Sequence, residues 1–161
     1  MQQYHLQNRP NRELTQESEM ADILKNGKFA VIAMCRENEP YVVTLSYGYD
    51  VEKKSLYFHC APQGLKLEFL SCNQNVCATV IDDGGYIPGA CEHEYQSVVF
   101  WGNMQIVSDL EEKKHGMSII LHHLEDNDFV VSEKMVKSEK YYSKMELLRL
   151  DIKQIHGKAG R

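Results

Sequence analysis

The sequence predicts a mainly β protein: an antiparallel barrel, closed or nearly closed, with helices on its periphery. Segments of strand length and strand composition recur along the chain, and short polar turns join most neighbours, as in antiparallel hairpins. Two or three other segments have the apolar spacing of helices. The expected strands are six, at residues 29–35, 41–49, 56–60, 76–81, 95–107 and 146–155. The 161 residues are 43% hydrophobic and 25% charged, so we expect a single globular domain over 1–161.

The strands differ in pattern. Residues 29–35 form an uninterrupted apolar run, which favours a strand buried on both faces. Residues 41–49 alternate and predict one continuous strand. The stretch 82–94 is irregular and rich in turn residues, which predicts a long loop that could serve as a lid or specificity element. Gly102 inside its strand predicts a bulge or a close backbone approach.

Three helices are expected. The first carries apolar residues at helical spacing up to Leu24, and Gly27 stands where a left-handed C-terminal residue would follow it. The second runs from Gly64 to about Ser71. The third opens with a capping box at Ser108 and continues to Leu124. Residues 125–144 are ambiguous, with a short helix expected between 132 and 142.

Charge and composition limit the partners. The net charge of −5 and the absence of a basic cluster argue against nucleic acid as the main partner. No apolar run approaches the roughly 20 residues that span a bilayer, so no membrane association is expected. The first residues lack a signal-peptide pattern, which predicts a cytoplasmic protein. The five cysteines are an odd number, and we expect them to be reduced rather than disulfide-bonded.

The stretch from Pro40 to Leu70 is the candidate site. Two strands lead through Ala61-Pro62 into a glycine-containing turn at Gly64 and a helix start with Lys66. This arrangement can present backbone N–H groups and one cation to a phosphate. Lys66 could equally be an ordinary solvated lysine. A cation is poorly placed at a helix start, however, because the helix dipole favours anions there, and a bound phosphate would resolve that misplacement.

Other chemistries have less support. Cys91-Glu92-His93 and His122-His123 lack the paired spacing of a zinc site, so no metal is expected. No Gly-x-Ser-x-Gly motif is present, which leaves a hydrolase triad without support.

Three segments of the sequence are similar to one known family. They are Thr44-Leu45-Ser46-Tyr47-Gly48-Tyr49, then Leu56-Tyr57-Phe58-His59-Cys60-Ala61-Pro62-Gln63-Gly64-Leu65-Lys66-Leu67, and Tyr95-Gln96-Ser97-Val98-Val99-Phe100-Trp101-Gly102. The C-terminal residues 148–152 and 155–158 also fit. Together they resemble the FMN-binding split-barrel proteins related to pyridoxamine 5′-phosphate oxidase, and most closely the 5-nitroimidazole-resistance (Nim-type) branch.

The resemblance implies a six-stranded antiparallel split β-barrel that holds FMN at a homodimer interface. It implies backbone contacts along the edge of the flavin ring from Thr44, Leu45, Ser46 and Tyr47. It places Phe58 and His59 at the ring and ribityl chain, Lys66 at the phosphate and Ser97 at the ring. The family usually carries a second basic residue where this chain has Leu65. The missing cation would weaken phosphate binding by about 1–3 kcal/mol.

The function implied is that of an FMN-dependent oxidoreductase, which transfers electrons from reduced flavin to a small acceptor, such as a nitroaromatic of the 5-nitroimidazole kind. His59 is the candidate catalytic residue, because a histidine can supply a proton near neutral pH; an ordinary, partly buried histidine is the alternative. Trp101 could wall the ring pocket or belong to an interface. The rival hypothesis is a non-catalytic protein that stores or senses flavin or, as a less favoured cofactor, haem.

Overall fold

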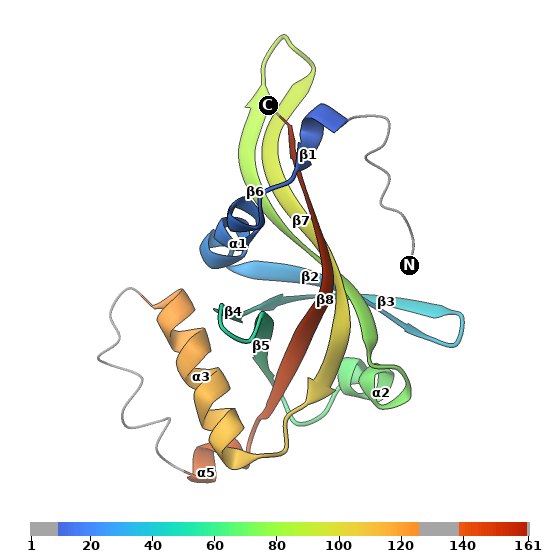
Figure 1. Ribbon diagram of the computed structural model, residues 1–161. Coiled ribbons are helices and arrows are strands. Elements are labelled where there is room, and N and C mark those ends of the chain that lie inside the picture. Colours follow the sequence, from blue (N-terminus) through green and yellow to red (C-terminus); the bar gives the residue numbers. More distant parts are fainter. Residues whose placement is uncertain (1–9, 126–138, 161) are drawn as a thin grey trace.

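The computed structural model describes residues 10–125 and 139–160. The strands form one twisted, strongly bent antiparallel sheet, and the helices lie around it (Figure 1). The strands are β1 (Glu13–Leu14), β2 (Phe29–Arg36), β3 (Glu39–Ser46), β4 (Gly48–Asp50), β5 (Ser55–Cys60), β6 (Asn75–Ile87), β7 (Glu92–Ile106) and β8 (Glu146–Gly160). The helices are α1 (Glu17–Asn26), α2 (Leu65–Cys72), α3 (Leu110–Leu124) and α5 (Glu139–Tyr142), and a 3₁₀ turn at Pro10–Arg12 precedes β1.

The sheet has the order β3-β2-β6-β7-β8-β5-β4, and β1 adds to β8. Every pairing is antiparallel. The two ends of this order, β3 and β4, are consecutive in the chain, so the sheet curls back on itself. The predicted fold class, a mainly β antiparallel split barrel with peripheral helices, is confirmed. Residues 10–125 and 139–160 form two more strands than the six expected, because β1 was not anticipated and the segment 41–49 divides at Tyr47.

The curved sheet encloses the main hydrophobic core. Fully buried residues of this core come from the strands, such as Ile32, Phe58 and Phe100, and from α1 and α2. α1 packs against β6 and β7, and α2 packs against β2 and β7. A second cluster lies under α3, which packs against β4, β5 and β8 and brings Met117 and Ile120 onto Tyr57. α3 therefore covers part of the outer side of the barrel (Figure 1).

The prediction that β2 is buried on both faces is wrong. Ala30, Ile32 and Met34 are buried in the core, but Phe29 is 60% exposed and Val31 is 36% exposed. The reason is that β2 has core on one side only, and none of the described helices packs over its other side. Its apolar outward residues therefore form surface.

The predicted loop at 82–94 is also wrong. β6 runs on to Ile87 and β7 begins at Glu92, so most of the stretch is a β-hairpin that projects from the body (Figure 1). A register shift between Asp83 and Gly85 absorbs the turn-rich composition without ending the ladder. The bulge predicted at Gly102 is confirmed by the register shift next to it, where an added Cβ would lie 2.3 Å from the Asp151 carbonyl oxygen.

The helix ends differ in detail from expectation. Gly27 has φ −65°, so it is not left-handed. It is a close-packing position instead, since an added Cβ would lie 2.6 Å from the Tyr47 hydroxyl. Asp109, rather than Ser108, caps α3 by accepting a 2.8 Å hydrogen bond from the Glu112 amide. Of the expected helix at 132–142, the part before 139 lies outside the described residues.

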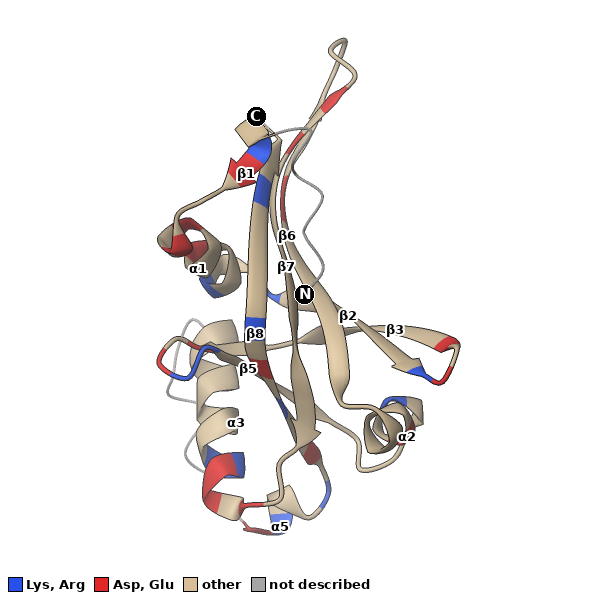
Figure 2. Cartoon of the chain, turned by 45° about the vertical axis from the view of Figure 1, so that its right-hand side comes forward, with Lys and Arg blue, Asp and Glu red and all other residues tan. Residues whose placement is uncertain are grey.

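Lysine and arginine are scattered among acidic residues along the described chain (Figure 2). None of the helices in the described ranges is long and apolar enough to cross a membrane. All five cysteines are free thiols.

Candidate cofactor site

The segment that the sequence predicts as one strand forks at Tyr47. Before it, β3 pairs with β2. After it, β4 pairs with β5 over three residue pairs, from Gly48↔Tyr57 to Asp50↔Ser55. Within the described chain, β5 beyond Tyr57 pairs only with β8, and β3 pairs only with β2. Two strand edges without ladder partners therefore diverge from Tyr47, and such edges leave backbone N–H and C=O groups available to a ligand.

Tyr47 fixes the point of the fork. It is fully buried, and its hydroxyl donates a 2.7 Å hydrogen bond to the Leu24 carbonyl of α1. Its ring lies between Phe58, at a centroid distance of 6.3 Å, and His123 of α3, at 4.8 Å. Burial raises the pKa of the Tyr47 hydroxyl. The side chain thus joins α1, β5 and α3 at one position.

The predicted contact residues of β3 face two ways. Thr44 is exposed and Ser46 is partly exposed on the outer side, whereas Leu45 packs against the core. On β5, Phe58 is completely buried in the core and His59 is exposed on the opposite side. Thr44, Ser46 and His59 can therefore offer side chains to a ligand. Leu45, Tyr47 and Phe58 can contribute only backbone.

Lys66 stands at the start of α2. Gly64 precedes the helix with φ 145°, a conformation that side chains rarely adopt, and its carbonyl accepts a 3.0 Å bond from the Leu67 amide. The Lys66 ammonium folds back to 3.8 Å from the place where a Gly64 Cβ would be. In the part of the chain that the structure describes, it has no carboxylate partner. A free cation thus lies over the positive end of a helix.

Lys66 also lies beside the end of β5. Burial raises the pKa of the Cys60 thiol, and the nearby Lys66 ammonium opposes that rise. Leu65, at the position of the missing second cation, is 45% exposed. The structure therefore brings the helix start next to the unpaired edge of β5, as a phosphate-bearing ligand would require.

Ser97 is apart from the fork but on the same outer side. Residues that pair across neighbouring strands lie on the same face of a sheet, and Thr44, Val31, Thr79 and Val99 form such a row from β3 to β7. Ser97 is two residues from Val99 on β7, so it lies on this face as well. Three strand spacings separate β3 from β7, roughly 14 Å. Ser97 is only 4% exposed, and its hydroxyl oxygen has no hydrogen-bond partner among the residues that the structure describes. A buried hydroxyl that lacks a partner costs free energy, so a ligand or a second chain that offered a hydrogen bond here would gain from it.

We call this side of β3, β2, β6 and β7 the outer face. It contains four strongly apolar exposed side chains: Phe29 (60%), Val31 (36%), Val42 (59%) and Ile81 (58%). Exposed apolar side chains gathered in this way are unusual on the surface of a monomer.

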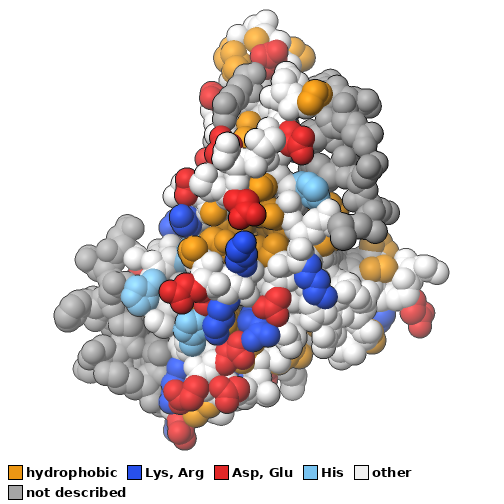
Figure 3. Space-filling model, viewed as in Figure 1, with side chains coloured by type: hydrophobic (Ala, Val, Ile, Leu, Met, Phe, Trp, Pro, Cys, Tyr) orange, Lys and Arg blue, Asp and Glu red, His pale blue; other side chains and the backbone are white. Residues whose placement is uncertain are grey.

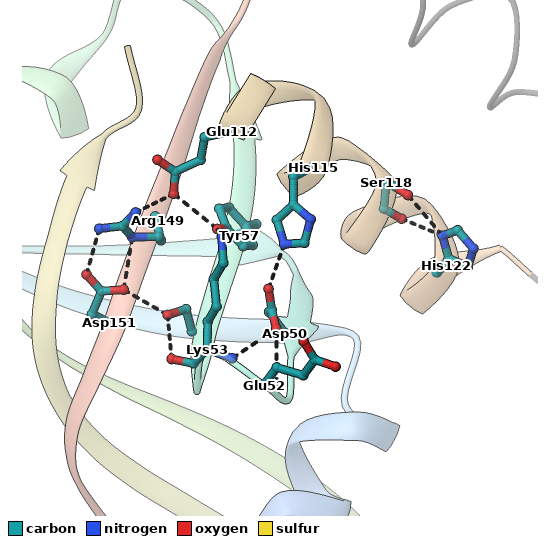
Figure 4. Close-up of polar contacts among 11 residues, drawn as sticks. Asp50, Glu52, Lys53, Tyr57, Glu112, His115, Ser118, His122, Arg149 and Asp151 are labelled. Carbon is teal, nitrogen blue, oxygen red and sulfur yellow. Dashed lines mark hydrogen bonds and ion pairs between the residues drawn. The ribbon is translucent and has the colours of Figure 1, made fainter. Parts of the chain in front are cut away.

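A polar network that the sequence pattern does not predict holds α3 against β5 and β8 (Figure 4). Arg149 of β8 pairs with Glu112 of α3, and Glu112 also accepts a 3.2 Å hydrogen bond from the Tyr57 hydroxyl. Arg149 pairs in addition with Asp151 at 2.9 Å. Burial raises the pKa of Asp151, but the hydrogen bonds from Ser55 and Arg149 outweigh it and the net pKa is lowered. This network fixes β5 at Tyr57, two residues before His59.

A cavity of about 290 Å³ lies elsewhere, between α1, β4 and β8. Its walls include Met20, Leu24, Ile152 and Ile155, and Glu17 and Lys54 form a 3.6 Å ion pair at its side. Hydrophobic side chains gather in this region among charged ones (Figure 3). None of the predicted site residues lines this cavity.

Solved structures with this fold come from several bacteria. A candidate 5-nitroimidazole antibiotic resistance protein from Bacteroides thetaiotaomicron is 25% identical, with a TM-score of 0.78 over 91% of this chain and 86% of that one. An FAD-binding protein from Mesorhizobium loti is 24% identical, with a TM-score of 0.68 over 93% and 98%. An FAD- and haem-binding protein from Mycobacterium smegmatis is 17% identical, with a TM-score of 0.76 over 93% and 74%. The last two likenesses concern the fold alone.

No curated protein matches the sequence. The family model described as pyridoxamine 5′-phosphate oxidase matches residues 16–159, which include the fork at Tyr47, the start of α2 and Ser97. The chain belongs to the pyridoxamine 5′-phosphate oxidase family.

Proposed function

We propose that the protein binds FMN as a homodimer and transfers electrons from the reduced flavin to a small acceptor of the nitroaromatic class, such as a 5-nitroimidazole. Family membership supports a flavin, as do the fold neighbours that are named for binding FAD. The likeness to the Bacteroides protein supports the nitroimidazole class of acceptor.

The observation that carries the proposal is the unpaired Lys66 ammonium over the start of α2. The first N–H groups of a helix have no intrahelical partners and form the positive end of its dipole. A second positive charge at that end is unfavourable until an anion lies between them. The FMN phosphate would be that anion, and a mononucleotide needs one such site.

From this phosphate site, the edge of β5 runs back toward the fork. The backbone groups of Thr44, Leu45, Ser46 and Tyr47 would meet the polar edge of the flavin ring, while the exposed His59 and the backbone of Phe58 would lie along the ring and ribityl chain. Leu65 contributes no charge. We therefore expect FMN affinity to be weaker than with two cations at this turn.

Ser97 and the outer face support a dimer. Ser97 is about 14 Å from β3 by strand spacing, which places its orphaned hydroxyl beyond the fork of its own chain. The exposed apolar residues around it, Phe29, Val31 and Ile81, suit burial against a second copy. In such a dimer the Ser97 hydroxyl would face a flavin held between the subunits.

When bound, the flavin would supply the electron transfer itself. The protein's part is to hold the phosphate, orient the ring and deliver protons. His59 is the residue for the last task, because its imidazole is exposed beside the unpaired edge of β5. Its replacement by Gln would keep hydrogen bonding but remove proton transfer.

The experiment that tests this function is turnover of a 5-nitroimidazole by the FMN-loaded protein with a chemical or enzymatic reductant. Reduction of the nitro group that falls at least tenfold in His59→Gln, with unchanged FMN content, supports the proposal. Stable FMN binding without turnover of any nitroaromatic would favour the rival, a storage or sensing protein. A Soret band in the purified protein would favour haem as its cofactor.

A further inference from the structure

His123 is a second histidine near the candidate site, next to His122 on α3. It lies in the last turn of α3, half-buried against the chain where β3 passes into β4. Its Nε2 atom is 2.6 Å from the Gly27 carbonyl oxygen, and its Nδ1 atom is 3.4 Å from the Tyr49 amide nitrogen. Its ring lies 4.8 Å from that of Tyr47.

These contacts define one protonation state. A carbonyl oxygen can only accept, so Nε2 carries the proton that goes to Gly27. The Tyr49 amide can only donate, so Nδ1 must be unprotonated. The neutral Nε2–H imidazole satisfies both partners, whereas the imidazolium would set an N–H against the N–H of Tyr49.

The surroundings of His123 favour that neutral form. Burial lowers its pKa, and the nearby Lys28 ammonium lowers it further, although the bond to the Gly27 carbonyl acts in the opposite direction. Lys28 also donates a 2.9 Å hydrogen bond to the His123 carbonyl. The titratable ring of Tyr47 also lies against the imidazole, and Tyr49 contributes its backbone amide. His122 is directed instead at Ser118 of its own helix (Figure 4).

The contact lies at the fork. Gly48, between the two tyrosines, has its Cα so close to α3 that an added Cβ would lie 2.5 Å from the Ile120 amide nitrogen. On the other side of Tyr47 is Phe58, which begins the unpaired edge of β5. The C-terminal half of α3 therefore packs against Tyr47, Gly48 and Tyr49, where the edges of β3 and β5 diverge.

We infer that His123 is a positioning residue for the cofactor site: it holds the Tyr47–Tyr49 segment so that the two unpaired strand edges keep their spacing, and its protonation loosens this hold. The inference rests on the proposed flavin site for its functional consequence but not for the contact itself. The hold is complete above pH 6.5, the ordinary value for histidine, and is lost as the pH falls through the lowered pKa of His123 in the folded protein. Flavin affinity should follow.

The test uses the full chain with His123→Gln, His123→Ala and, as the matched control, His122→Gln. Glutamine can donate to Gly27 and accept from Tyr49 but does not titrate. In the flavin-free protein, the amide resonances of Gly48 and Tyr49 are followed by NMR from pH 8 to pH 5. We expect them to titrate in the unchanged protein and in His122→Gln, and to stay constant in His123→Gln.

FMN titrations at the same pH values give the functional part. We expect the dissociation constant of the unchanged protein to rise several-fold more than that of His123→Gln between pH 7.5 and pH 5, because only the unchanged protein loses the neutral imidazole in acid. His123→Ala should bind weakly at both pH values. Amide resonances that ignore pH, or a Gln variant that behaves like Ala, would overturn the inference. Absence of FMN binding by the unchanged protein at every pH contradicts the proposed function. In that case the pH titration of the Gly48 and Tyr49 amide resonances by itself supports or overturns the role of His123 in holding this segment.

Discussion

His115 Nε2 lies 2.7 Å from Asp50 Oδ2, and this contact fastens the first half of α3 to the turn that follows β4. Asp50 is almost fully buried, and its other carboxylate oxygen accepts hydrogen bonds from the amides of Glu52 and Lys53. Together with Arg149 and Glu112, this carboxylate holds α3 against β4 and β5 (Figure 4). The helix therefore supports the strands around the candidate cofactor site.

The first prediction concerns acid stability. Burial raises the pKa of Asp50, but the hydrogen bonds from His115 and the Lys53 amide outweigh it, so the net pKa is below 3.8. A carboxyl group whose pKa is lower in the folded than in the unfolded protein stabilises the fold at pH values above the unfolded pKa. This contribution to the free energy of unfolding is lost as the pH falls below about 3.8. Asp50→Asn should lower the free energy of unfolding near pH 7 by about 1–3 kcal/mol and flatten its decline in acid. Thermal denaturation from pH 7 to pH 2 measures both effects; equal slopes for the two proteins would contradict the account.

A second prediction concerns Lys66. Lys66→Ala removes the cation at the start of α2 and should weaken FMN binding about ten- to hundredfold, the range for a charged hydrogen bond. The thermal stability of the flavin-free protein should stay the same or rise, because the cation opposes the helix dipole. Fluorescence titration with FMN measures the affinity. Lys25→Ala, on the exposed side of α1, is the control and should leave it unchanged; equal affinities for the two variants would exclude Lys66 as the phosphate ligand.

Leu65→Arg reverses the departure from the family pattern. Leu65 is partly exposed next to Lys66, so an arginine can be accommodated and can pair with a phosphate. We expect FMN to bind about tenfold more tightly, with a steeper salt dependence. Leu65→Gln is the uncharged control. An arginine variant no tighter than the glutamine variant would show that the phosphate lies elsewhere.

The course of the barrel was predictable because alternation and turn chemistry are local properties. The fork at Tyr47 was not, since residues 41–49 alternate without interruption. The break is imposed by tertiary contacts of Tyr47 with Leu24, Phe58 and His123 that lie far away in sequence. The hairpin at 82–94 was missed for a related reason. Its glycines and Pro88 predict a loop, yet the register shift between Asp83 and Gly85 lets the ladder continue to Ile87.

The candidate site was predictable where one stretch of sequence carries it. Residues 44–47, His59 and Lys66 lie around the fork and the adjoining helix start. The part played by α3 was not predictable. Glu112, His115 and His123 are typical of a solvated helix face, and only the packed structure shows that all three contact β-strand residues or the loop at Gly27.

Replacing Ser97 by Ala should stabilise the flavin-free protein but weaken the binding of FMN. In the flavin-free protein, Ser97→Ala removes a buried hydroxyl that has no partner, so the free energy of unfolding should rise by about 1 kcal/mol. In the FMN-bound dimer the hydroxyl would have a partner, so the variant should bind FMN several-fold more weakly. Thr79→Val is the matched control, because the Thr79 hydroxyl donates a 2.8 Å hydrogen bond to the Val98 carbonyl and should stabilise the flavin-free protein. Weaker stability of flavin-free Ser97→Ala would mean that the hydroxyl already has a partner.

The outer face should be the dimer interface. Val42→Glu places a charge on β3 among exposed apolar residues, and burying that charge in an interface is costly. Light scattering coupled to size-exclusion chromatography should give a dimer mass for the unchanged protein and a monomer mass for this variant. Val51→Glu, at a similarly exposed valine in the turn after β4, should remain dimeric. A Val42→Glu protein that keeps the dimer mass would exclude this face.

The most direct test of the central claim is the absorbance spectrum of the freshly purified protein, recorded before and after denaturation and repeated with added FMN. The account predicts an oxidised-flavin spectrum, with FMN released on unfolding, or its appearance on reconstitution with FMN and its loss in Lys66→Ala. A colourless protein that does not bind added FMN, or one whose only chromophore is haem, would contradict it.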